Sequence, residues 1–183
     1  MLAEAAGPEA RDELLGLYRT AFGALIAQGA VYVGFGYFRA DDGRVSMAAL
    51  NVFVKDVREA NPYLIVQQTV NAHAEGGPQH GPGVSATALE LPCGPAAFVI
   101  RMTLAPDDVA AVSPAAWQAQ AVIPFPQGRK VVVIDLSTPN PTEAPYYAGI
   151  LDGIAHTVAF TEDRPDGTSA QHHADSRIAQ ALG

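Results

Sequence analysis

Three turn sequences separate stretches of alternating apolar residues, and they constrain the fold more than any other feature of this chain. The turns lie at residues 41–43 (Asp-Asp-Gly), 92–95 (Pro-Cys-Gly-Pro) and 126–128 (Pro-Gln-Gly). Asp and Gly tolerate the positive φ of a tight hairpin, and proline holds φ near the value that many turns need. Each turn is flanked by two strand-like runs, so the sequence predicts three antiparallel hairpins.

The strands expected around these turns are residues 31–39 with 45–54, 84–91 with 97–104, and 117–124 with 130–138. Gly34 and Gly36 fall on one face of the first strand, where they leave a trough that a helix or another backbone can approach closely. Residues 131–134 are apolar on both faces. This pattern predicts a strand inside the sheet that is covered on both sides.

Segments with helical periodicity precede and follow the predicted strands in the sequence. Residues 11–28 carry apolar side chains at steps of three and four, with Gly29 placed to end the helix in a left-handed conformation. A second apolar stripe runs from Tyr146 to Val158, with Thr142 as its expected N-cap and Pro145 in its first turn. Residues 61–70 fit a short helix, although their β-branched residues leave a strand open.

The chain is therefore predicted to be an α+β protein, an antiparallel meander sheet of about six strands flanked by N- and C-terminal helices. At 183 residues it fits one domain, expected over residues 1–162. Residues 163–183 are polar and have no periodicity, which is typical of a flexible tail.

Charge and composition exclude several classes of function. The formal net charge of −8 and the isoelectric point near 4.9 oppose binding to nucleic acid or to an anionic membrane. No apolar run approaches the roughly 18 residues of a membrane span. The single cysteine, Cys93, cannot form an internal disulfide, and the first residues do not resemble a secretory signal. These features predict a cytoplasmic protein.

One pattern resembles the zinc site of nucleobase deaminases, which combines H-x-E with P-C-x-x-C. His73 and Glu75 match its first half and Cys93 part of its second, but Ala96 stands where the second cysteine must be. Catalytic zinc requires three protein ligands, and only two would remain here. We therefore expect neither a metal site nor a cofactor.

Two further groups of polar residues have both a chemical and an ordinary interpretation. His73, Glu75 and His80 lie in or beside a loop rich in glycine, where they could hold a metal weakly or be simply solvated. Asp152 and His156 lie four residues apart on the last predicted helix. Such a pair can orient a catalytic base, but without a nucleophile beside it a surface pair is favoured.

Asp135 interrupts the most apolar strand of the chain and raises a similar choice. Its carboxylate is either solvated at an open strand end or buried in a pocket that would mark a functional site. The solvated position is favoured because an unpaired buried carboxylate is costly. Arg101, at the centre of its own strand, is the candidate partner in the buried alternative.

The C-terminal third contains three segments that together resemble a known group of proteins: residues 122–126 (Val-Ile-Pro-Phe-Pro), 132–140 (Val-Val-Ile-Asp-Leu-Ser-Thr-Pro-Asn) and 150–155 (Ile-Leu-Asp-Gly-Ile-Ala). They are similar to actinobacterial proteins with the PsbP/Mog1-like α/β/α sandwich, some of which are encoded near type VII secretion genes. The resemblance implies a binding or accessory role without an established reaction. It carries over no functional residue.

The leading functional hypothesis is a non-enzymatic accessory or protein-binding domain, which the resemblance links to a secretion system. It would recognise a basic or neutral protein partner through an exposed sheet face, a sheet edge or the loop at residues 75–83. Its candidate surface includes Gly34, Gly36, His73, Glu75, His80 and Asp135. The alternative is a small-molecule-binding protein or a hydrolase with a pocket near Gly34, Gly36 and Asp135. A homodimer formed through an open sheet edge or through exposed aromatic side chains is compatible with both.

Overall fold

The computed structural model describes residues 19–20, 22–39, 43, 45–74, 83–104 and 115–161. Residues 22–27 are helical and lead into the first strand. The elements that follow are β1 (Ala30–Arg39), β2 (Val45–Asp56), α2 (Pro62–Ala74), β3 (Ser85–Leu91), β4 (Gly94–Leu104), β5 (Ala115–Pro124), β6 (Lys130–Thr138), the 3-10 helix η1 (Pro141–Glu143) and α3 (Ala144–His156). Four parts of the predicted elements lie outside the described residues: residues 11–18 of the first helix, residues 41–42 of the first turn, the glycine-rich loop up to residue 82 and the tail at residues 163–183.

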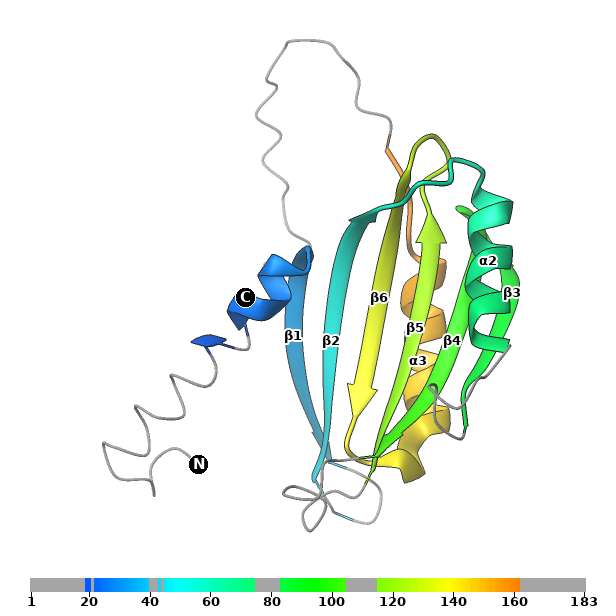
Figure 1. The fold of residues 1–183 in the computed structure, drawn as a ribbon. Helices are drawn as coiled ribbons and strands as arrows, with labels where there is room; N and C mark the ends of the chain where they lie inside the picture. Colours follow the sequence, from blue (N-terminus) through cyan, green and yellow to red (C-terminus); the bar gives the residue numbers. More distant parts are fainter. Residues whose placement is uncertain are drawn as a thin grey trace, which may run out of the picture.

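The six strands of the described ranges form one antiparallel sheet in the order β1-β2-β6-β5-β4-β3. The α+β class, the three hairpins and the flanking helices are thereby confirmed. The meander covers only β3 to β6, because the β1–β2 hairpin is attached beyond β6. β6 consequently lies inside the sheet, as its apolar sequence predicts, and β1 and β3 form the two edges (Figure 1).

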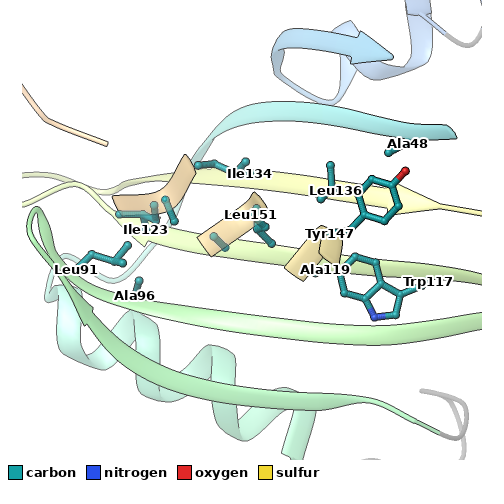
Figure 2. Close-up of a cluster of buried hydrophobic side chains, with 12 residues drawn as sticks. Ala48, Leu91, Ala96, Trp117, Ala119, Ile123, Ile134, Leu136, Tyr147 and Leu151 are labelled. Atoms are coloured by element: carbon teal, nitrogen blue, oxygen red, sulfur yellow. The ribbon is translucent and has the colours of Figure 1, made fainter. Parts of the chain in front are cut away.

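Helices cover both faces of this sheet. Figure 1 shows α2 in front of the strands and α3 behind them. On the α3 face, Tyr147, Leu151 and Ala155 pack at helical spacing against alternate residues of β5 and β6. Figure 2 shows Tyr147 and Leu151 beside Ala119 and Leu136 in this larger core.

The α2 face has a smaller core of Phe53, Ile65, Val131 and Val133, against which Leu25 of the first helix also packs. The first helix and α2 thus lie on the same side of the sheet. We call the two sides of the sheet the α2 face and the α3 face. Among the helices of the described ranges, none is long and apolar enough to cross a membrane.

The ends of the helices follow from local chemistry. Gly29 has a φ of +87°, which confirms it as the residue that ends the first helix. Asn61 caps α2, because its Oδ1 accepts a hydrogen bond from the Tyr63 backbone N–H at 3.0 Å. The helical interpretation of this segment is therefore right.

The expected N-cap of the last helix is wrong. α3 starts at Ala144 after Glu143, and Thr142 lies within η1. The Glu143 backbone N–H donates to the Asn140 carbonyl at 3.1 Å, so a 3-10 turn provides the entry in place of a side-chain cap. Pro145 occupies the first turn of α3 as predicted.

Candidate functional site

The residues proposed from sequence for one pocket lie on opposite faces of the sheet. Asn51 of β2 is paired with both Val33 of β1 and Asp135 of β6, and directly paired residues of a sheet share a face. Side chains alternate along a strand, so Gly34 and Gly36 belong to the other face. A single pocket formed by Gly34, Gly36 and Asp135 is therefore excluded, and two separate pockets take its place.

The first is a polar pocket on the α2 face with a volume of about 400 Å³. It lies over β2, β6, β5 and β4 and reaches Leu25 and Gln28 at the end of the first helix. Its lining residues are Leu25, Gln28, Asn51, Phe53, Lys55, Arg101, Gln118, Gln120, Val122, Val133, Asp135 and Ser137. It thus collects two cations, one carboxylate and several side-chain amides in one hollow of the sheet.

Asp135 is the centre of a hydrogen-bond network in this pocket. Its Oδ2 accepts hydrogen bonds from Gln118 Nε2 and, at 2.7 Å, from Gln120 Nε2. Gln118 in turn accepts a hydrogen bond at 2.6 Å through its Oε1 from Arg101 Nε. Arg101 is therefore linked to Asp135, but through an intervening amide.

This burial corrects the favoured prediction of a solvated carboxylate. Asp135 is only 4% exposed, because β6 is central in the sheet and both neighbouring strands shield it. The hydrogen bonds from the two amide groups offset the free-energy cost of removing the Asp135 carboxylate from water. The alternative of a buried carboxylate in a pocket is the right one.

Asn51 lies beside this network, and one of its side-chain atoms has no hydrogen-bond partner among the described residues. It is the direct partner of Asp135 on β2 and is 9% exposed. In the described part of the chain its buried Oδ1 has no hydrogen-bond partner. A buried polar atom without a partner costs about 1 to 3 kcal/mol, so it requires a structural or functional explanation.

The second pocket is apolar, has a volume of about 200 Å³ and lies on the α3 face. It is lined by Tyr32, Gly34, Phe35, Gly36, Ala48, Leu50, Leu136, Tyr147, Ile150 and Ile154. The expected trough at the two glycines thus exists between β1 and α3. At Gly34 it is occupied by a neighbour, because an added Cβ would lie 2.7 Å from the Tyr32 hydroxyl oxygen.

β1 borders this apolar pocket and is an edge strand with large exposed side chains. Val31 is 65% exposed, Tyr32 54% and Tyr37 66%. These residues point to both faces of the sheet, and β1 carries no charge before Arg39. Aromatic and apolar surface thus adjoins a sheet edge that, among the described strands, pairs with β2 alone.

Of the candidates in and beside the glycine-rich loop, only His73 lies in the described part of the chain. His73 lies in the last turn of α2 and its Nδ1 is 2.8 Å from the Thr69 carbonyl oxygen, whereas Glu75 and His80 lie outside the described residues. His156 Nδ1 lies 3.5 Å from Asp152 Oδ1, and both side chains are about half exposed. This geometry is that of a surface pair.

Metal and thiol chemistry gain no support in the described ranges. Among their His, Cys, Asp and Glu residues, no group of three could hold a metal ion. Burial raises the pKa of the Cys93 thiol, with a smaller contribution of the same sign from Glu90. A raised pKa keeps the thiol protonated and makes it a poor nucleophile at neutral pH.

The sequence interpretation did not identify the other polar residues of this pocket, which include Asn51, Lys55, Gln118 and Gln120. A signal was present, because Gln118 and Gln120 alternate with Trp117, Ala119 and Ala121 and must share one face of β5. Their position beside Asp135 depends on the pairing of β5 with β6, which places Gln120 directly opposite Asp135.

Comparisons with protein-family models, with curated proteins and with solved structures found no significant match, so the resemblance to the PsbP/Mog1-like group stays a prediction.

Proposed function

We propose that this protein is a cytoplasmic binding domain that takes up an extended segment of a partner protein along the edge strand β1. The observation that supports this proposal is the exposure of Val31, Tyr32 and Tyr37 on a ten-residue edge strand. A partner strand added there would satisfy backbone groups of β1 and cover its aromatic side chains.

The sequence of β1 is consistent with such a role. Edge strands are commonly protected from pairing by inward lysines, prolines or a bulge along their length. β1 has neither lysine nor proline, and its irregularity lies at its start, between Ala30 and Tyr32. The seven consecutive pairs from Val33 to Arg39 keep a regular ladder with β2. A regular, apolar edge is a template for strand addition.

The chemistry of the partner follows from the surface. Side chains of an added strand alternate, so every second one would be directed to the α3 face, where the apolar pocket begins at Gly34 and Gly36. We expect an apolar residue at those positions of the partner. The net charge of −8 favours a segment that is neutral or basic elsewhere.

A displayed library of random peptides tests this proposal, because selection from it needs no named partner. The native chain should enrich peptides with alternating apolar residues and an excess of Lys and Arg. Tyr32→Lys and Tyr37→Lys should each abolish the enrichment, because a lysine on the edge opposes both apolar contact and a basic peptide. Tyr63→Lys is the matched control, since Tyr63 is 64% exposed on α2, away from β1.

Two results would contradict the proposal. Peptides that bind Tyr37→Lys as tightly as the native chain would place the binding surface elsewhere. A concentration-dependent dimer in light scattering that disappears in Tyr37→Lys would show that β1 serves a second copy of this chain in place of another protein.

A further inference from the structure

We propose that the polar pocket on the α2 face is a binding site for a small carboxylate that also carries N–H or O–H donors, such as an amino acid or a hydroxy acid. This site shares no residue with the exposed part of β1. It would add a ligand-binding activity to the proposed binding of a protein segment.

The first argument is the unused acceptor capacity of the pocket. Asn51 Oδ1 is buried and has no partner in the described part of the chain. Asp135 receives both amide donors, Gln118 and Gln120, on the same oxygen, Oδ2. Its Oδ1 has no donor among the described residues. Two acceptor atoms on paired residues of β2 and β6 are therefore available to accept hydrogen bonds from a bound molecule.

The second argument is the unused cationic capacity. Arg101 uses Nε for Gln118, which orients its guanidinium group at the pocket. Within the described ranges its two terminal nitrogens have no acceptor, and such a planar pair suits a carboxylate. Lys55 supplies a second positive charge at the rim, with its Nζ 5.0 Å from the centre of the Phe53 ring.

The combination selects the class of ligand. Lys55, Arg101 and Asp135 sum to a formal charge of +1, which favours an anion. The buried carboxylate of Asp135 would repel a compact, highly charged anion such as phosphate, whereas it attracts an ammonium or hydroxyl group. The volume of about 400 Å³ falls in the range of small-molecule pockets. A ligand with an anionic group at Arg101 and a hydrogen-bond donor at Asp135 and Asn51 would supply a partner to the Arg101 terminal nitrogens and to the Oδ1 atoms of Asp135 and Asn51.

The experiment measures binding of L-glutamate, L-malate, succinate and glycerol by titration calorimetry at ligand concentrations up to about 10 mM, far above the Kd of a well-fitted small ligand. L-glutamate and L-malate should bind saturably. Succinate lacks the donor and glycerol lacks the carboxylate, so both should bind at least about tenfold more weakly, the usual effect of losing one charge-assisted hydrogen bond.

Substitutions test which atoms hold the ligand. Arg101→Gln should weaken the binding of L-glutamate and L-malate about tenfold or more, and Asn51→Ala should weaken both about three- to tenfold. Asp135→Asn should weaken L-glutamate more than L-malate, because an ammonium group gains more from a carboxylate than a hydroxyl does. Arg58→Gln, an exposed residue outside the pocket, is the matched control and should bind normally.

Lys55→Gln keeps the test decisive if substitution inside the network disturbs folding, because Lys55 is exposed and its loss should weaken binding about two- to threefold. The proposal is overturned if the native chain binds neither L-glutamate nor L-malate, or if Arg101→Gln and Lys55→Gln both bind them normally. Tyr37→Lys should bind these ligands as the native chain does, which separates this test from that of the β1 edge.

Discussion

Gly29 links the end of the first helix to the sheet through a conformation that other residues rarely adopt. Its φ is +87°, and its carbonyl oxygen accepts a hydrogen bond at 3.1 Å from the Val54 backbone N–H of β2. A Cβ at this position would lie 2.9 Å from the Val54 carbonyl oxygen. Both the backbone angle and the space therefore require glycine.

We expect Gly29→Ala to lower the free energy of unfolding by about 1 to 3 kcal/mol, the usual cost of a strained backbone conformation. Urea denaturation followed by circular dichroism measures this change. Gly23→Ala is the control, because Gly23 is helical and an added Cβ meets nothing within 4 Å. The free energy of unfolding of Gly23→Ala should equal or exceed that of the native chain. Equal losses in both variants would refute the conformational argument.

Tyr147 shows how one polar atom is accommodated in the core of the α3 face. Its hydroxyl oxygen and Ser46 Oγ lie 2.6 Å apart and share a buried hydrogen bond between α3 and β2. Asn140 Nδ2 also donates to Ser46 Oγ, at 3.2 Å. This group of three fixes the position of α3 across the sheet.

Tyr147→Phe should reduce the free energy of unfolding by about 1 kcal/mol, because Ser46 loses a partner while the ring still fills its place. The neighbouring Tyr146 is 61% exposed, so Tyr146→Phe should have little effect. Denaturation of both variants under the same conditions makes the comparison. If Tyr147→Phe is as stable as the native chain, the hydrogen bond contributes nothing net.

At the scale of elements, fewer residues of α3 are fully buried than its apolar sequence suggests. Tyr147, Leu151 and Ala155 are almost fully buried, whereas Ile150 and Ile154 are partly exposed and line the apolar pocket. The helix therefore contributes one fully buried row of side chains to the core and a second, partly exposed row that packs against this core and lines the apolar pocket.

Leu151→Ala should cost about 2 to 5 kcal/mol, because Leu151 is 0% exposed and its removal leaves a cavity. Ile154→Ala removes a similar number of atoms from a partly exposed position, so its loss should be clearly smaller. Thermal and urea denaturation provide both values. A larger loss for Ile154→Ala would mean that the pocket wall, and not the row at Leu151, anchors α3.

On the scale of the whole molecule, the central strands belong to both cores. β6 places Ile134 and Leu136 on the α3 face and Val131 and Val133 on the α2 face. If the packing on one face were lost, the strands that also carry the core of the other face would be exposed to water. The two cores should therefore unfold together.

The single tryptophan, Trp117, reports on the α3 face, and Ile65 of α2 lies on the opposite face. Ile65→Ala should shift the denaturation midpoint of Trp117 fluorescence and of far-UV circular dichroism to the same extent, with a loss of about 2 to 5 kcal/mol. A fluorescence transition that stays at the native midpoint while the dichroism signal moves would show independent unfolding of the α2 face.

Local sequence determined the hairpins, the end of the first helix at Gly29 and the apolar row of α3, because these depend on turn chemistry and on periodicity within a few residues. The start of α3 was not predictable from Thr142, since a 3-10 turn at residues 141–143 competes with a side-chain cap and precedes the helix.

Only the tertiary structure decided where function can lie. The alternation along each strand is local, but the attachment of the β1–β2 hairpin to β6 is a pairing between residues about 80 positions apart. That pairing separates Gly34 and Gly36 from Asp135 by the thickness of the sheet and places Asn51 beside Asp135. Strand order is set by the summed burial of both faces, which no local pattern encodes, so the two pockets emerge only when the sheet is assembled.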